Sequence, residues 1–171
     1  MKKIVLFLFL LVTFVFSGCI KNDLVKWTGS QVEFDAATWN ANSAGLTYPI
    51  VTRVPVYGGA INSTNSPTLI TRTTGQFQLR VNLVGAQKST DQTFNVRVVP
   101  GESTAVEGTH YAPIPATGII PANSSFGYVT VKTLDPGAST GSKTLVLELT
   151  SNDVLQANVN YAKLGLSIAQ N

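Results

Sequence analysis

Apolar and polar residues alternate along much of this chain. The clearest stretch is residues 77–83, in which every second residue from Phe77 to Leu83 is apolar and the residues between them are polar. A period of two places one set of side chains on each side of an extended chain, which is the pattern of a strand with one buried face. The alternation predicts strands over residues 77–83, 94–98, 144–150 and 162–168.

Shorter apolar stretches predict further strands at residues 32–34, 50–57, 68–71, 119–120 and 126–131. Pro49 and Pro55 make the stretch at 50–57 an edge or bulged strand, because proline has no backbone donor for a central ladder. No segment has a helical period long enough to cover a sheet. The sequence therefore predicts an all-β fold, an antiparallel immunoglobulin-like sandwich of about seven to nine strands after a signal peptide.

The first nineteen residues have the layout of an export signal. Lys2 and Lys3 precede an apolar run over residues 4–16, which would make about 20 Å of helix, short of the roughly 30 Å that a membrane span needs. A cleaved signal peptide is favoured over a transmembrane anchor. The residues from Phe16 to Cys19 resemble the lipobox of bacterial lipoproteins, although Phe16 stands where leucine is usual. The resemblance implies lipid attachment at Cys19; ordinary secretion with a free thiol is the alternative.

This processing divides the chain into a signal peptide (1–18), a lipidated cysteine with a tether (19–30) and a sandwich domain (31–171). The mature chain keeps ten basic and nine acidic residues, so its charge argues against nucleic acid as a partner. Residues 20–23 resemble the sorting signal of Bacteroidetes-type lipoproteins. That resemblance implies an outer-membrane protein that is held by its lipid anchor and faces the cell exterior, with the periplasmic face as the alternative.

A second resemblance covers roughly residues 65–170. The run Ala-Val-Glu-Gly-Thr-His-Tyr at 105–111, followed by residues 119–123 and the alternating strand at 128–131, is similar to the Calx-beta pattern, in the form found in uncharacterised Bacteroidetes-type lipoproteins. The resemblance implies that Tyr111 packs into the sandwich. Asn123 replaces the turn glycine of the family, and we expect it to adopt the left-handed conformation that asparagine tolerates.

The mature chain offers few groups for catalysis. His110 is the only histidine, and the resemblance assigns it a structural place beside Tyr111. Calcium is bound by several carboxylates in some Calx-beta domains, whereas the acids here, Glu102, Glu107, Asp135 and Asp153, are scattered. Zinc would need three or four histidine or cysteine ligands. We therefore expect no catalytic residues, no metal and no cofactor, although two carboxylates could still serve a glycosidase.

Aromatic residues are the remaining candidates for a site. Trp27, Trp39, Tyr48 and Tyr57 lie in the N-terminal third among several asparagines, including Asn40 and Asn42. Exposed rings flanked by amides would suit stacking on sugars, and Trp39 and Tyr48 are the candidates for ligand binding. The alternative is that Trp39 and Tyr57 fill the core of the sandwich.

The function that we expect is a non-catalytic surface lipoprotein. It would act as an adhesion, scaffold or accessory binding module for a polysaccharide or a surface protein partner. By analogy with the lipoproteins that it resembles, it would be linked to an outer-membrane nutrient-uptake system. A glycan-binding protein with an aromatic site is the alternative, and a hydrolase is a third.

Overall fold

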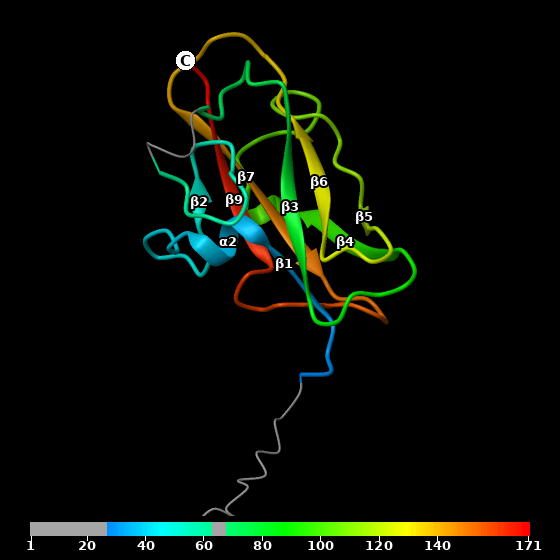
Figure 1. Ribbon diagram of the computed structural model, residues 1–171. Coiled ribbons are helices and arrows are strands. Elements are labelled where there is room, and N and C mark those ends of the chain that lie inside the picture. Colours follow the sequence, from blue (N-terminus) through cyan, green and yellow to red (C-terminus); the bar gives the residue numbers. More distant parts are fainter. Residues whose placement is uncertain (1–26, 63–67) are drawn as a thin grey trace, which may run out of the picture.

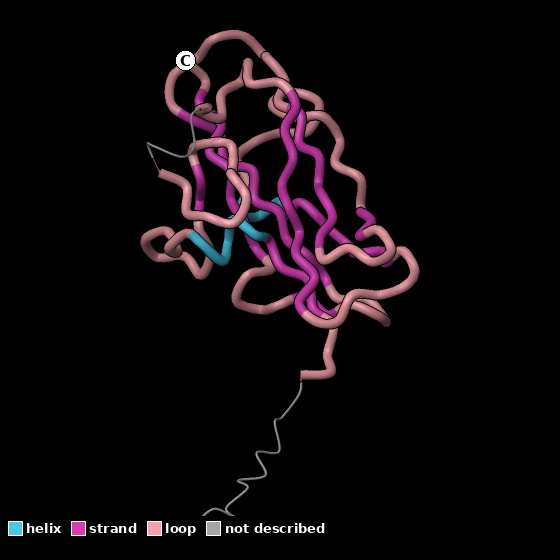
Figure 2. The backbone as a smooth tube through the Cα atoms, in the orientation of Figure 1, coloured by secondary structure: helices cyan, strands magenta, loops and turns pink. Residues whose placement is uncertain are grey.

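The computed structural model describes residues 27–62 and 68–171, so Cys19 and the signal segment lie outside the described residues. Strands dominate these ranges, and helix is limited to short segments (Figure 2). The elements are β1 (Gln31–Phe34), α2 (Asp35–Trp39), β2 (Ile50–Val51), β3 (Gln76–Val84), β4 (Gln92–Val98), the 3-10 turn η1 (Pro100–Glu102), β5 (Thr117–Ile120), β6 (Phe126–Lys132), β7 (Ser142–Thr150), β8 (Gln156–Ala157) and β9 (Lys163–Ala169).

The strands form two sheets that pack face to face (Figure 1). One sheet has the order β6-β3-β1-β8, and the other has the order β2-β9-β7-β4-β5. The sandwich predicted from the alternation is confirmed. Most neighbouring strands are antiparallel, as expected, but the short edge strands β8 and β2 run parallel to β1 and β9. β8 and β2 have two residues each and form one edge of their sheets, while β6 and β5 form the other edges.

The four clearly alternating segments became β3, β4, β7 and β9, and three of the weaker ones became β1, β5 and β6. The stretch at 50–57 is a strand only over Ile50–Val51, and the stretch at 68–71 contributes single bridges from Leu69 and Thr71. Pro55 explains part of the shortening, because it cannot donate the hydrogen bond that would extend the ladder. The sequence pattern did not predict α2 or β8.

The core lies between the inner sides of the two sheets. In β3 the residues with odd numbers from Phe77 to Leu83 are buried, while the residues between them are half-buried or exposed. This parity matters for function, because it assigns the even-numbered residues of β3 to the outer side of the sandwich. The largest fully buried side chains are Phe34, Phe94, Ile70, Leu79, Ile120, Leu145, Leu147, Leu149, Leu155, Leu164, Leu166 and Ile168.

The Calx-beta-like motif folds as expected. Tyr111 is 4% exposed, and its carbonyl accepts a hydrogen bond from the backbone of Gly108 at 2.8 Å. His110 Nδ1 accepts the backbone N–H of Val106 at 2.9 Å, which confirms its structural place. Asn123 has φ of 57°, so asparagine adopts the left-handed turn conformation in place of glycine.

Helix α2 follows β1 without a linker and contacts β1, β3 and β9 (Figure 1). Ala36 and Ala37 are buried, and their small side chains let the turn pack closely against the strands. The Asn40 side chain donates to the carbonyl of Ala36 at 2.7 Å and so ends the helix. No helix in the described ranges reaches the length and hydropathy that a membrane span needs.

Candidate functional site

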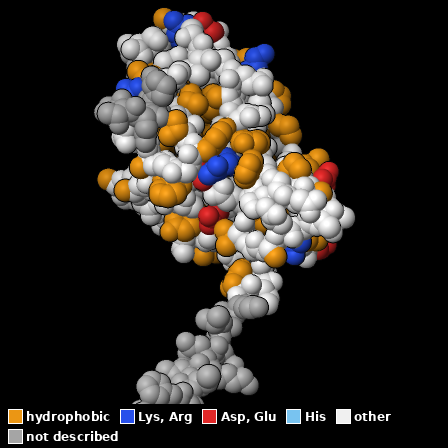
Figure 3. Space-filling view, in the orientation of Figure 1, with side chains coloured by type: hydrophobic (Ala, Val, Ile, Leu, Met, Phe, Trp, Pro, Cys, Tyr) orange, Lys and Arg blue, Asp and Glu red, His pale blue; other side chains and the backbone are white. Residues whose placement is uncertain are grey.

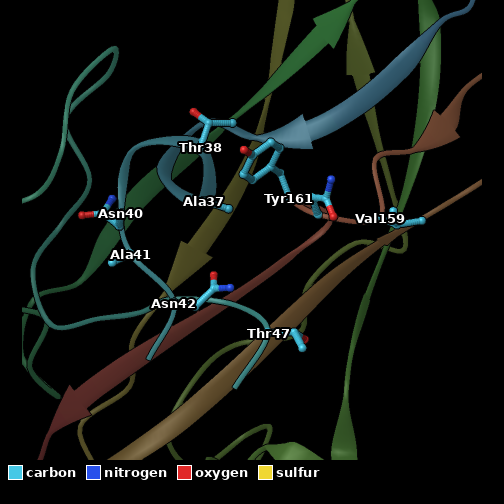
Figure 4. Close-up of a pocket in the computed structure, with 9 residues that line it drawn as sticks. Ala37, Thr38, Asn40, Ala41, Asn42, Thr47, Val159 and Tyr161 are labelled. Carbon is cyan, nitrogen blue, oxygen red and sulfur yellow. The ribbon is translucent and has the colours of Figure 1, made fainter. Parts of the chain in front are cut away.

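A pocket of about 660 Å³ opens beside α2 (Figure 4). We call it the α2 pocket. Three segments line it: α2 itself, the loop that follows it, and the turn between β8 and β9. A volume of this size is typical of sites for small molecules. The lining residues are Ala37, Thr38, Asn40, Ala41, Asn42, Thr47, Val159, Asn160 and Tyr161.

Backbone hydrogen bonds hold the turn between β8 and β9 against β1. The N–H of Phe34 donates to the carbonyl of Tyr161 at 3.0 Å, and the N–H of Tyr161 donates to the carbonyl of Asn158 at 2.9 Å. On the opposite side, the Asn40 side chain accepts the N–H of Ile61 at 2.9 Å in addition to its bond to Ala36. Asn40 therefore fixes the loop, and in Figure 4 its amide points away from the cavity.

The lining of the α2 pocket carries no charged side chain. Asn42, Thr47, Asn160 and Tyr161 have no side-chain hydrogen bond to any described residue, so their polar groups are available to a ligand. Figure 4 shows the Asn42 amide directed toward the cavity and the Tyr161 ring beside Thr38. The pocket can therefore donate and accept hydrogen bonds and offer one ring, but it holds no carboxylate, imidazole, thiol or amine that could move a proton at neutral pH.

The two aromatic residues proposed from the sequence have different environments. Trp39 is 50% exposed at the end of α2, next to the pocket lining but not part of it. Tyr48 is 4% exposed, so our expectation of an available ring at this position is wrong. Its ring packs under Lys163, with Nζ 5.2 Å from the ring centroid. Burial, together with the neighbouring Glu102 carboxylate, raises the pKa of Tyr48 to about 12.

A second polar cluster lies on the outer side of the four-stranded sheet, and the sequence analysis did not single it out. Asp35 is 2% exposed, yet it is charged. Its Oδ1 accepts hydrogen bonds from Arg80 at 2.6 Å and from Asn82 at 3.0 Å, and its Oδ2 accepts the N–H of Gly58 at 3.0 Å. Burial would raise the pKa of Asp35, but these three donors outweigh it and hold the pKa below its usual value.

Glu33 precedes this cluster on β1 and faces the same side. Its Oε2 accepts a hydrogen bond from the Asn158 side chain at 2.8 Å. Desolvation raises its pKa, and the nearby Asp35 charge adds to the rise, while hydrogen bonds from Asn158 and Asn82 oppose it. The cluster of Glu33, Asp35 and Arg80 thus carries two acids and one base.

The acids considered for calcium are separated in the fold. Glu102 binds Lys163 with Oε1 2.8 Å from Nζ, and Asp135 binds Arg72 on another part of the surface. Within the described ranges, no three residues among the histidines, cysteines and acids come close enough together to hold a metal ion.

Comparisons with known proteins identify a family. The family described as "Domain of unknown function (DUF4843)" matches residues 69–165, which include β3 to β8 and the start of β9. No curated protein matches the chain.

Among solved structures the chain is similar to domains of Calx. The apo form of the Calx CBD1 domain is 16% identical over 58% of this chain and 87% of that one, with a TM-score of 0.45. The Calx CBD2 domain is 12% identical over 60% of this chain and 82% of that one, with a TM-score of 0.47. The structure of CBD12 from CALX1.2 is 16% identical, with a TM-score of 0.47. The match covers 58% of this chain and 39% of that longer chain.

Proposed function

The chain belongs to the DUF4843 family, and we propose that it is a non-catalytic binding module whose ligand is a neutral carbohydrate. The observation that carries this proposal is the lining of the α2 pocket. Its side chains are uncharged, and four of them have hydrogen-bonding groups with no partner among the described residues. A sugar without charge presents hydroxyl groups that match amide and hydroxyl side chains, and its C–H face matches the Tyr161 ring.

The chemistry of the lining favours binding over turnover. Hydrolysis of a glycosidic bond needs a pair of carboxylates on either side of that bond. The lining has none, and His110 is engaged by Val106 in a loop of the Calx-beta-like motif, outside the lining. Binding without reaction is the role that these groups support.

We further propose that the module is held at the outer membrane by a lipid on Cys19 and faces the cell exterior. The described chain enters at one end of the sandwich, and the C-terminus lies at the opposite end (Figure 1). An anchor at Cys19 would therefore attach the sandwich by one end and leave its long sides open to solvent. In this position the protein would serve as an accessory glycan-binding partner of surface proteins, including those of nutrient uptake.

The proposal is tested by titrating the full-length protein in detergent with neutral mono- and disaccharides by calorimetry. Asn42→Ala and Asn160→Ala each remove one hydrogen-bonding group, so each should weaken binding about two- to tenfold. Asn171→Ala, which removes an exposed amide at the C-terminus, is the matched control and should leave the affinity unchanged. Trp39→Ala should keep binding but remove much of any tryptophan fluorescence response. Failure of every neutral sugar to bind would refute a carbohydrate ligand.

A further inference from the structure

Three aromatic rings surround Arg80 on the outer side of the four-stranded sheet. The guanidinium carbon of Arg80 lies 5.1 Å from the ring centroid of Tyr57 and 5.5 Å from that of Phe126. The Tyr128 ring lies between them, with centroids 5.6 Å from Tyr57 and 5.8 Å from Phe126. These distances are typical of favourable cation–π and edge contacts. We call Tyr57, Arg80, Phe126 and Tyr128 the aromatic face.

Two rings of the aromatic face are exposed, and the third, Tyr128, is half-buried. Tyr57 is 44% exposed and Phe126 is 39% exposed. In β6 the buried residues are Gly127, Val129 and Val131, so Phe126 and Tyr128 point away from the core. Figure 3 shows basic side chains framed by hydrophobic ones near the middle of this face, with acidic side chains beside them. Tyr57 and Phe126 therefore present part of their surface to solvent and do not belong to the buried core.

The aromatic face is held rigidly before any ligand arrives. Asp35 fixes the Arg80 guanidinium at 2.6 Å and also binds Gly58, next to Tyr57, at 3.0 Å. The backbone beside Tyr57 and the Arg80 side chain of β3 are thereby tied to the same carboxylate, and the Tyr57 hydroxyl lies 3.5 Å from the carbonyl of Gln78 on that strand. Rings that are already ordered lose little conformational entropy on binding, which favours their use as a stacking surface.

Charge on this side of the sheet selects the ligand class. Glu33 and Asp35 offset Arg80 and the exposed Lys132 on this side of the sheet, so these groups give no excess of positive charge that would attract a polyanion. The amides of Asn82 and Asn158 lie in the same region, because Glu33 pairs with Asn82 across β1 and β3 and accepts from Asn158. Exposed rings beside amides and a fixed guanidinium match a neutral sugar, whose C–H face stacks on rings and whose hydroxyls take the hydrogen bonds.

The aromatic face and the α2 pocket adjoin through shared segments. Asp35 begins α2, and Ala37 and Thr38 of the same helix line the pocket. Asn158 binds Glu33 on the sheet, and Val159, the next residue, lines the pocket. From β1 to β6 the sheet spans two strand spacings, about 10 Å. Arg80 on β3 and the rings of β6 therefore lie one and two strand spacings from Glu33 on β1.

We propose that the α2 pocket and the aromatic face form one extended surface that binds a neutral polysaccharide chain. The pocket holds one unit, and the rings of Tyr57 and Phe126 stack on units further along the chain. This inference rests on the proposed function, because it extends the same carbohydrate ligand from a single sugar to a polymer. A chain bound at both places gains affinity that a short sugar cannot reach.

Affinity electrophoresis tests the inference, with the full-length protein run in gels that contain a glucan, a mannan, a galactan or a xylan. Tyr57→Ala and Phe126→Ala should each weaken retention by the bound polymer about tenfold. Neither should change the affinity for a monosaccharide in calorimetry. Tyr57→Phe and Phe126→Tyr keep the rings and should keep retention. Val106→Ala, which truncates a 55% exposed apolar side chain in another loop, is the control.

The outcomes separate the two proposals. If Asn42→Ala weakens retention while Tyr57→Ala and Phe126→Ala do not, the extended surface is refuted and the pocket remains the site. If neither a neutral polysaccharide nor a neutral sugar binds the wild-type protein, both proposals are refuted. The exposed rings would then be tested for binding to a protein partner. Stronger retention by a polyanion than by a neutral polymer would also overturn the assignment of ligand class. Melting curves show whether each variant is folded, and a fold defect in Tyr57→Ala leaves Phe126→Ala to decide.

Discussion

Removing the charge of Asp35 is the most direct test of how the outer side of the sheet is held together. Asp35→Asn keeps nearly the same shape but leaves the partly buried Arg80 without its counterion. Truncating one partner of a buried ion pair typically costs about 3–5 kcal/mol. The Arg80 side chain is 21% exposed, and water compensates part of that loss. We therefore expect the free energy of unfolding to fall by about 3 kcal/mol.

Thermal and urea unfolding followed by circular dichroism measure this effect. For a domain of this size, a loss of about 3 kcal/mol lowers the melting temperature by roughly 6–12 °C. Asp153→Asn is the matched control, because Asp153 is exposed and has no hydrogen bond to another described residue. Arg80→Met combined with Asp35→Asn should be less destabilised than the sum of the single variants, since the two side chains interact directly.

The pH dependence gives the same variant a second readout. The pKa of Asp35 is lower in the folded protein than in the unfolded chain. Its contribution to stability is therefore fully present above the unfolded pKa of about 4 and is lost as the pH falls through the lower folded value. The difference between wild type and Asp35→Asn should be constant near neutral pH and should shrink below pH of about 4. A difference under about 0.5 kcal/mol at pH 7, or one that grows on acidification, would refute the ion-pair argument.

Three further predictions concern the lipid anchor at Cys19, Tyr111 in the Calx-beta-like motif, and Glu33 on β1. Cys19→Ala should leave an unprocessed precursor that does not partition with the outer membrane, which mass spectrometry and fractionation can check. Tyr111→Ala should lower the free energy of unfolding by about 3–5 kcal/mol, because the ring is 4% exposed, whereas Lys132→Ala at an exposed position of β6 should have little effect in the same melt. The pKa of Glu33 is raised on folding, so the wild-type protein becomes more stable relative to a variant without this acid as the pH falls. Glu33→Gln should therefore be at least as stable as wild type at pH 7 and should lose that advantage near pH 4. Urea titrations at the two pH values measure the difference.

Alternation predicted the sheets well because it depends on burial of one face, which the sandwich imposes on every long strand. It failed where that constraint is weak. Only Ile50–Val51 of the predicted stretch at 50–57 pairs in a sheet, and the remainder crosses the outer side, where Gly58 binds Asp35. Helix α2 has five residues, too few for a helical period to be visible in the sequence.

The aromatic face could have been found from the same parity that predicted the strands. Val129 and Val131 point inward, so Phe126 and Tyr128, which have the opposite parity, had to point outward. Large rings on the polar side of a predicted strand are therefore a sequence signal for an exposed surface. Trp39 and Tyr48 gave no such signal, because neither lies in an alternating strand. Trp39 is the last residue of α2 and is 50% exposed, whereas Tyr48 lies in the loop before β2 and is 4% exposed.

The α2 pocket, in contrast, depends on a pairing that no local pattern contains. Its two sides come from segments more than a hundred residues apart, and they meet because β8 pairs in parallel with β1, with Gln31 opposite Gln156 and Val32 opposite Ala157. That register places Asn158 against Glu33 and brings the carbonyl of Tyr161 to the N–H of Phe34. A slip of one residue would turn Asn158 away from Glu33 and move Tyr161 out of the lining. The α2 pocket and Glu33 on the outer side of the sheet therefore depend on one register, which is the physical reason for proposing that the pocket and this side of the sheet act together.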